Sequence, residues 1–514
     1  MVAGGASKSF LQGLVPLVAP GLLPLAIACG ESSGPSSTAD GRGGTSGDAG
    51  TGGSTTGGNG TGGGGNAWFE VIDPLPSAVI TPEDDPDLVQ HETVLLGASA
   101  DGRVVFGTSW ALVMDGGRVA VDGFRWTREG GIENLGYAEE PPPEAPIVQP
   151  RTISRDGSVI FGSYGPGVTA PLFRWSAASG MVLLETLDSA GYVELGALSD
   201  DGGVLCGAQR IGGGSEAVRW TEDDGLSRLG FLPGEAASSA AAISADGETV
   251  VGASGSRVYR FTPSGGMEDL GLGTCGVARD GLSGDGAVVV GRCTAADGGT
   301  EAFVWNGGEG KTSLGTLPAS VPISDVEASP EGRVVVAQSR VGREDYQAVR
   351  ASEATGFVRL GSFPGLPTCV VVRHNSFRPV PDTRRSSSRD GSVVAGTCIT
   401  TSGTADNRGF RWSEQGGLVP LEPLAGDVET WVTSVSPDGI VGGMSIGDAA
   451  AQRAVIWDAS GAPRAIATDL EAAGVDLGGF RLDEDLVVLE GARVVYGVGH
   501  DAADAGRAWI ARLP

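Results

Sequence analysis

The sequence predicts an all-β fold, a single β-propeller of eight or nine four-stranded blades closed by an N-terminal strand. One motif recurs nine times, at spacings of 39 to 59 residues. The typical copy has a Ser-x-Asp-Gly turn, a valine-rich run that ends in Gly, and an aromatic residue on a later extended segment. About four short extended segments per copy at this period are typical of propeller blades.

The first element of each copy is a tight turn. Asp-Gly between two extended runs predicts a hairpin, because Gly readily adopts the positive φ that such a turn requires. The valine-rich run that follows suits an inner strand, and we expect its closing Gly where blades crowd near the axis. The acidic-Gly pairs begin at Asp101, Asp156, Asp201, Asp246, Asp285, Glu331, Asp390, Asp438 and Glu490.

The next element is a strand that carries a large aromatic ring, most often 19 to 22 residues after the acidic residue. We expect each ring to insert between neighbouring blades, where it buries a large apolar surface. The sixth copy has Ala351 at this position. The other copies have Trp126, Trp175, Trp220, Phe261, Trp305, Trp412, Trp457 and Trp509.

These copies resemble the extracellular HAF repeat, which is named after a His-Ala-Phe segment before the tryptophan strand. The match is carried by residues 301–305, Glu-Ala-Phe-Val-Trp, and by the Ser-x-Asp-Gly halves such as 154–162 and 388–396. No copy has the His. The resemblance covers about residues 97–514 and implies a secreted or surface β-propeller-like protein, without implying a particular activity.

The two ends of the repeat array are expected to meet. The ninth copy stops one strand short, at residues 508–514, whereas residues 67–73, Ala-Trp-Phe-Glu-Val-Ile-Asp, form an extra extended segment before the first copy. An open propeller would expose a strand edge, so we expect this segment to complete the last blade. The propeller is therefore predicted over residues 67–514, with one turn of helix at Asp469–Ala473.

Residues 1–28 resemble a bacterial lipoprotein signal peptide. An apolar stretch from Phe10 to Ile27 ends in Leu-Ala-Ile-Ala just before Cys29. The resemblance implies that Cys29 is lipidated, and the Gly30 that follows it implies the outer membrane or cell surface. Periplasmic or secreted placement is the alternative, and the prolines in the apolar stretch disfavour a retained membrane span.

Residues 29–66 form the lipidated Cys and a Gly/Ser/Thr-rich tether. From Gly30 to Asn66 no apolar residue is larger than Ala or Pro, so the segment cannot bury enough surface to order itself. A flexible chain of this length has an average span of roughly 30 Å. That length would place the propeller clear of the lipid headgroups.

The charge of the chain excludes some partners. The formal net charge is −28, with 35 Lys and Arg against 63 Asp and Glu. Nucleic-acid binding needs clustered Lys and Arg and is therefore not expected. We expect membrane contact only through the lipid anchor, and a monomer.

Five cysteines remain after Cys29. Cys293 and Cys398 each lie eight residues after the Asp of their copy, and Cys275 and Cys369 each precede the same hairpin. We predict the disulfides Cys275–Cys293 and Cys369–Cys398, which an exported location permits, and a buried free thiol at Cys206. A cysteine metal cluster is the alternative, but the chain has no Cys-x-x-Cys pair.

An insertion in the seventh copy concentrates positive charge in an otherwise acidic chain. Loop faces of propellers are where binding residues tend to lie, so this loop is a candidate binding site for an anionic glycan or an acidic partner. The alternative is a solvated loop, or one paired with the acidic surface of the protein itself. The candidate residues are Arg373, His374, Arg378, Arg384, Arg385 and Arg389.

No catalytic, cofactor or metal residues can be assigned. The chain has only three histidines, His91, His374 and His500, so general-base chemistry has few candidates. We therefore expect a lipid-anchored binding or structural scaffold of the cell envelope. An envelope enzyme acting on polysaccharide through carboxylates, of glycosidase or lyase type, is the main alternative, and a sensor or assembly factor is another. An enzyme should bring two or more carboxylates of distinct environment into one pocket.

Overall fold

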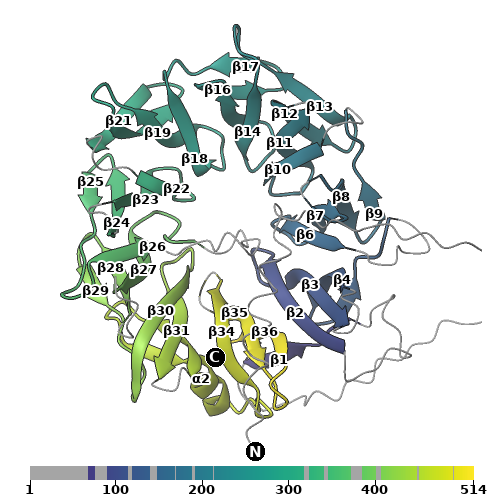
Figure 1. The fold of residues 1–514 in the computed structure, drawn as a ribbon, viewed down its shortest axis with the longest axis vertical. Coiled ribbons are helices and arrows are strands. Elements are labelled where there is room, and N and C mark those ends of the chain that lie inside the picture. The colour runs from purple at the N-terminus through teal and green to yellow at the C-terminus, as the bar shows by residue number, and fades with distance from the viewer. Residues whose placement is uncertain are drawn as a thin grey trace, which may run out of the picture. The chain divides into compact units, whose positions relative to one another are not determined.

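The chain folds into nine antiparallel four-stranded blades arranged as a ring (Figure 1). The structure, a computed structural model, describes residues 67–75, 89–113, 119–138, 147–167, 169–187, 192–211, 213–317, 323–340, 345–371, 385–400, 407–447, 451–489, 491 and 493–514. The predicted β-propeller is confirmed, with nine blades rather than eight.

Each blade is a meander in which strands adjacent in sequence pair with one another, and its first strand lies innermost (Figure 1). Blade 1 comprises β2 (Val89–Ala98), β3 (Val104–Val113), β4 (Val119–Thr127) and β5 (Gly131–Asn134). Blade 2 comprises β6 (Val148–Ile153), β7 (Val159–Tyr164), β8 (Leu172–Ser176) and β9 (Gly180–Leu183). Blade 3 comprises β10 (Tyr192–Leu198), β11 (Val204–Ile211), β12 (Gly214–Thr221) and β13 (Gly225–Gly230).

The middle blades repeat the same order. Blade 4 comprises β14 (Ser238–Ile243), β15 (Val250–Ser254), β16 (Arg257–Thr262) and β17 (Gly266–Asp269). Blade 5 comprises β18 (Cys275–Leu282), β19 (Val288–Thr294), β20 (Thr300–Asn306) and β21 (Gly310–Leu317). Blade 6 comprises β22 (Ile323–Ala328), β23 (Val334–Arg340), β24 (Tyr346–Ser352) and β25 (Gly356–Arg359).

The last blades complete the ring. Blade 7 comprises β26 (Thr368–Val371), β27 (Val393–Ile399), β28 (Arg408–Ser413) and β29 (Gly417–Pro420). Blade 8 comprises β30 (Asp427–Val435), β31 (Val441–Gly447), β32 (Gln452–Trp457) and β33 (Pro463–Ala465). Blade 9 comprises β34 (Arg481–Val488), β35 (Val494–His500), β36 (Gly506–Arg512) and, from the other end of the chain, β1 (Trp68–Ile72).

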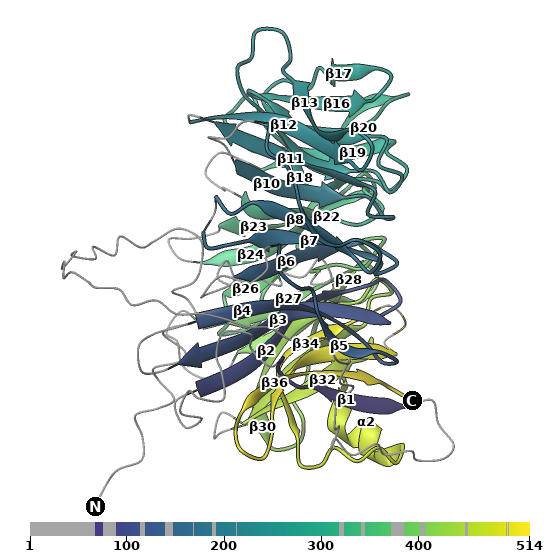
Figure 2. The same cartoon turned by 90° about the vertical axis from the view of Figure 1, so that its right-hand side faces the viewer.

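The N-terminal strand closes the ring as predicted. β1 runs antiparallel to β36 (Figure 2). In this pairing, Trp68 lies opposite Arg512 and Ile72 opposite Ala508. Blade 9 is then joined to blade 1 through Thr93, whose hydroxyl donates to Ile72 O (2.9 Å) and accepts from the Ala508 N–H (2.7 Å). The last blade is therefore built from both ends of the repeat array.

The acidic residue of the repeat has a structural role in the turn. In blade 2 the Ser154 hydroxyl donates to Asp156 Oδ1 (2.7 Å) and accepts from the Val159 N–H (3.0 Å). Gly157 has φ +78°, and the Ser158 N–H donates to Asp156 Oδ1 (2.9 Å). These hydrogen bonds hold the pKa of Asp156 below its usual value, and the bond from the Ser154 hydroxyl makes the largest contribution. The same Ser–Asp bond recurs at Asp101, Asp201, Asp246, Asp285, Asp390 and Asp438.

The valine-rich run forms the second strand of each blade, an inner strand as expected, but its closing Gly has a different role from the expected one. In blade 2 a Cβ on Gly162 would overlap the carbonyl oxygen of Gln149, which lies beside a β-bulge in β6. The Gly therefore accommodates the bulge of the neighbouring strand in its own blade, and not the approach of another blade. The same overlap with the first strand occurs at Gly107, Gly207, Gly252, Gly291, Gly396 and Gly443.

The repeated aromatic residue packs between blades, as expected. Trp175 of blade 2 is 3% exposed and lies in one cluster with Leu96 and Phe106 of blade 1. Trp457 of blade 8 is packed against Val393 of blade 7 in the same way. Each ring thus links its blade to the preceding one.

The ninth copy departs from this register. Leu489 N–H donates to Val494 O, as Ser99 N–H donates to Val104 O in blade 1, so Val495 corresponds to Val105. Val105 pairs with Trp126, but Val495 pairs with Ala511. Trp509 instead faces Gly497 and packs against Phe69, whose ring also contacts Phe480. In the ninth copy, Ala511 therefore occupies the position that corresponds to Trp126. The assignment of Trp509 to this position was wrong, because Trp509 lies two residues before it.

The cysteines are arranged as predicted. Cys275 is bonded to Cys293 across β18 and β19, and Cys369 to Cys398 across β26 and β27. Cys206 on β11 is a buried free thiol. Disulfides of this kind are typical of proteins in an oxidising, exported compartment.

The expected turn of helix is part of a short helix, α2 (Ile466–Ala472), which lies against blade 8. Ile466 and Leu470 are buried on one side of it. In the described part of the chain, no helix has the length and apolar character needed to cross a membrane.

Candidate functional site

Backbone hydrogen bonds join the turns of neighbouring blades at residue x of the Ser-x-Asp-Gly motif. The Arg155 N–H donates to Asp200 O (2.7 Å), and the Arg389 N–H donates to Pro437 O (2.8 Å). These bonds use main-chain atoms only, so they do not depend on the side chain at x. Equivalent bonds run from Ala100 to Arg155, from Asp200 to Ala245 and from Ala245 to Gly284.

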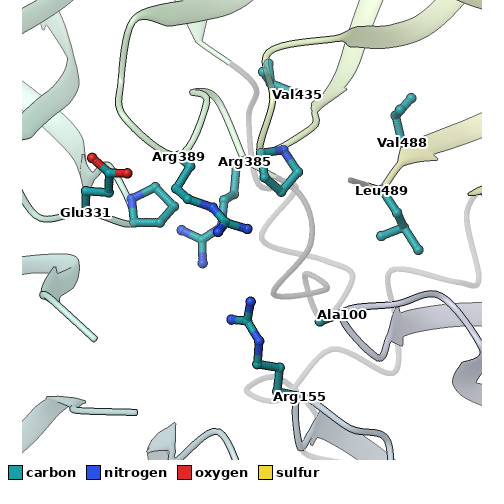
Figure 3. Close-up of a pocket in the computed structure, with 10 residues that line it drawn as sticks. Ala100, Arg155, Glu331, Arg385, Arg389, Val435, Val488 and Leu489 are labelled. Atoms are coloured by element: carbon teal, nitrogen blue, oxygen red, sulfur yellow. The ribbon is translucent and has the colours of Figure 1, made fainter. Parts of the chain in front are cut away.

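Inside the ring, the turns at Ala100, Arg155, Arg389 and Pro437 help to line a pocket of about 280 Å³. Its lining residues come from blades 1, 2, 6, 7, 8 and 9, so the pocket lies between turns that are far apart in sequence. Figure 3 shows the guanidinium groups of Arg155, Arg385 and Arg389 directed into the same space. This is a concentration of positive charge in a chain whose net charge is −28.

The rest of the lining is mainly apolar. Val435, Pro437, Val488 and Leu489 form one side of the pocket, and three of them are seen together in Figure 3. Glu331 is the one carboxylate among the described residues that line it. The pocket thus combines three cations, one anion and an apolar wall.

Arg155 and Arg385 have carboxylate neighbours that do not line the pocket. Arg155 Nη1 lies 3.6 Å from Asp200 Oδ2, and both side chains are about half exposed, 53% and 49%. Arg385 Nη1 lies 3.0 Å from Asp280 Oδ2 and is 23% exposed. The Arg155–Asp200 pair is weak, because water screens exposed charges, whereas the Arg385–Asp280 pair is shorter and partly buried.

Arg385 is held firmly by the chain around it. Its carbonyl accepts from the Val435 N–H (3.1 Å) of blade 8. The next residue, Ser386, is fully buried, and its hydroxyl donates to Glu327 Oε2 (2.6 Å) on β22. Burial raises the pKa of Glu327, while the Ser386 hydrogen bond and the charge of Arg385 act in the opposite direction. The hydrogen bond between Ser386 and Glu327 therefore fixes the end of the seventh-copy insertion beside the pocket.

The predicted binding loop is only partly within the described residues. Arg385 and Arg389 lie at the pocket, as a binding role would require. Arg373, His374, Arg378 and Arg384 lie outside the described residues, as does the predicted lipidation residue Cys29. The pocket therefore brings together two of the six candidate residues.

Sequence reasoning missed Arg155. It is far from the insertion in sequence, but it occupies the same repeat position as Arg389, directly before the Asp of the turn. Aligning the nine copies and comparing residue x would have revealed it. Residues at one repeat position converge in a closed ring.

The other titratable clusters lie elsewhere. His500 Nδ1 is 2.7 Å from Asp483 Oδ1 within blade 9, and the Tyr137 hydroxyl donates to the largely buried Asp122 (2.5 Å) near blade 1. Among the described residues, no three His, Cys, Asp or Glu side chains are grouped so as to hold a metal ion.

Comparisons with known proteins bear on architecture alone. No family model matches the chain, and no curated protein is similar to it. Among solved structures, an oligogalacturonate lyase from Vibrio parahaemolyticus is 12% identical, with 87% of this chain and 97% of that chain covered and a TM-score of 0.39. TolB from Acinetobacter baumannii is 11% identical, with 57% and 95% covered and a TM-score of 0.30. A prolyl endopeptidase is 9% identical, with 80% and 55% covered and a TM-score of 0.43. Likeness at this level carries no argument about ligand or activity.

Proposed function

We propose that this chain is an exported, lipid-anchored propeller of the cell envelope that acts as a binding scaffold. The observation that carries the binding role is the pocket inside the ring, where three arginines face an apolar wall. Concave sites with an apolar lining and a few convergent polar groups are typical of ligand binding.

The anchoring part of the proposal rests on the sequence. The apolar stretch before Cys29, with small residues next to the Cys, supports acylation, and Gly30 supports the outer membrane. The two disulfides support export. The segment from Gly30 to Asn66 would serve as the tether.

The alternative, an enzyme that cleaves polysaccharide through carboxylates, has less support at this pocket. Such enzymes use two carboxyl groups placed on either side of the scissile bond. Glu331 is the one carboxylate that lines the pocket among the described residues. Asp280 and Glu327 differ in environment, but neither side chain lines it.

Two experiments test the proposal. Metabolic labelling with a palmitate analogue should mark the wild-type protein and not a Cys29→Ser variant; equal label on both would contradict the anchor. The purified full-length protein should retain acidic glycans on an array of envelope and plant-type polysaccharides without converting them. Release of new reducing ends or unsaturated products would instead favour the enzyme.

A further inference from the structure

We propose that the pocket inside the ring binds a compact anionic ligand, a sugar acid or sugar phosphate, whose oxyanion is held by Arg155, Arg385 and Arg389. The inference deepens the binding role proposed above, and it rests on that role. It does not depend on the lipid anchor. Its evidence is the convergence of charge, the repeat position of two of the arginines, the fixed place of the third, and the shape of the lining.

The first step concerns charge. Three guanidinium groups in one small pocket repel one another, and the repulsion is stronger where part of the surroundings is apolar. Among the described residues that line the pocket, Glu331 is the one carboxylate, while Asp200 and Asp280 contact Arg155 and Arg385 from outside it. A bound anion would be attracted to all three groups. The described lining of this pocket is thus net positive within a strongly acidic chain.

The second step concerns the repeat. Arg155 and Arg389 occupy residue x of their turns, where other copies have Ala100, Asp200, Ala245, Gly284, Pro330 and Pro437. The turn and its bonds to the next blade use main-chain atoms at x, so small residues serve equally well. The hydrogen bonds of the turn therefore do not require arginine at this position, and the half-exposed Arg155–Asp200 pair adds little stability. Their side chains face the same pocket from blades 2 and 7, which a ligand role explains.

The third step concerns Arg385. Its backbone is fixed by Val435, and its guanidinium contacts Asp280 on the side of blade 5. The neighbouring Ser386 is locked to the buried Glu327. A charged group held in place before the ligand arrives loses less freedom on binding, so it contributes more to affinity. Asp280 and Glu327 are positioning residues in this arrangement.

The fourth step concerns the ligand. A guanidinium presents N–H donors in a planar fork that matches the two oxygens of a carboxylate or phosphate. The volume of about 280 Å³ is near the lower end for small-molecule sites, which favours a single sugar unit over a protein segment. The apolar wall of Val435, Pro437, Val488 and Leu489 would face the C–H side of the ring. Glu331 offers an acceptor for a ligand hydroxyl.

Titration calorimetry on the full-length protein tests this inference with four probes, namely glucuronate, glucose 6-phosphate, inorganic phosphate and neutral glucose. At least one of the two sugar anions should bind more tightly than glucose, and the stronger of the two identifies the oxyanion. Inorganic phosphate alone as a ligand would show an anion site without sugar recognition and would overturn the sugar part. Failure of both sugar anions to bind at millimolar concentration, or equal binding of glucose, would overturn the inference.

Variants locate the site. Arg155→Ala and Arg389→Ala should each weaken binding about tenfold or more, the loss expected for a hydrogen bond to a charged group. Arg155→Lys should retain part of the affinity, because the charge remains while the fork is lost. The control is Arg103→Ala, a turn arginine with an 86% exposed side chain outside the pocket, which should bind like wild type. Unchanged affinity in both pocket variants, with normal thermal unfolding, would refute the placement.

The result is separable from the anchor. The Cys29→Ser protein should bind the same ligand with the same affinity. Sugar-anion binding by a wild-type protein that takes up no palmitate label would support the pocket without the anchor. Label that depends on Cys29, in a protein that binds neither sugar anion, would support the anchor and overturn the pocket ligand.

Discussion

The hydroxyl of Ser386, at the end of the seventh-copy insertion, donates a 2.6 Å hydrogen bond to the carboxyl group of Glu327 on the first strand of blade 6. Both side chains are buried, at 0% and 6% exposure. Glu327 also lies opposite Arg279 in the parallel bridge that connects blades 5 and 6. One residue pair therefore ties together three blades and the loop that places Arg385.

This pair makes stability depend on pH. Burial raises the pKa of Glu327 above 4.5, so the folded protein holds this proton more tightly than the unfolded chain does. The contribution of protonated Glu327 to the free energy of unfolding is fully present below about 4.5, the unfolded value. It is lost as pH rises from there through the folded pKa. Urea unfolding at a series of pH values should show this decline in wild type.

Glu327→Gln supplies the comparison for that decline. The amide imitates the neutral acid and can still accept from Ser386, but it does not titrate. The difference in unfolding free energy between variant and wild type should therefore grow in favour of the variant as pH rises above 4.5. A constant difference across the range would show that Glu327 has an ordinary pKa.

A second prediction concerns the closing Gly of the valine-rich strand. Gly162→Ala should lower the free energy of unfolding by about 1 to 3 kcal/mol, because the new Cβ overlaps the Gln149 carbonyl and the bulged strand must shift. Gly276→Ala is the matched control, since a Cβ at Gly276 meets nothing within 4 Å. Equal effects of the two substitutions in urea unfolding would contradict the role given to the bulge.

A third prediction tests closure by the N-terminal strand. Ile72 is 1% exposed and lies in a cluster formed by blades 1 and 9. Ile72→Ala should cost about 2 to 5 kcal/mol, the range for deleting buried methyl groups. Asp73→Ala, one residue further and exposed, should have little effect on thermal or urea unfolding. A small effect of Ile72→Ala would mean that the ring is stable without its latch.

A fourth prediction concerns Cys206. The thiol is buried, and desolvation raises its pKa to about 12, so it is protonated and unreactive in the folded protein. Iodoacetamide should label it only after unfolding. Mass mapping without reduction should recover Cys275–Cys293 and Cys369–Cys398 as the bonded pairs. Rapid labelling of the native protein at Cys206 would contradict its place in the core between blades 3 and 4.

The sequence predicted the features that arise from local rules. Asp156-Gly157 forms the expected hairpin, because positive φ and the Ser154–Asp156 bond involve residues close in the chain. Trp175 packs between blades, because the repeat gives every copy the same neighbours. The strand at Trp68–Ile72 could be placed because the last copy lacks one strand.

The remaining features depend on contacts between distant residues. Trp509 lies two residues before the repeated aromatic position, and it packs there against Phe69 from the other end of the chain. Arg155 joins Arg389 only when the ring is closed and their turns face each other. The reason for Gly162 lies in a bulge of the preceding strand, which no pattern in the valine-rich run reveals.

The position of β1 has a mechanical consequence. β1 is the outermost strand of blade 9, and it continues directly from the segment that would lead to the anchor at Cys29. Any pull between membrane and ligand would then be carried first by the hydrogen bonds between β1 and β36, and not by the remaining eight blades. Under load the molecule should yield at this seam, where the detached strand would expose Ile72 and the edge of β36 while the pocket turns stayed in place.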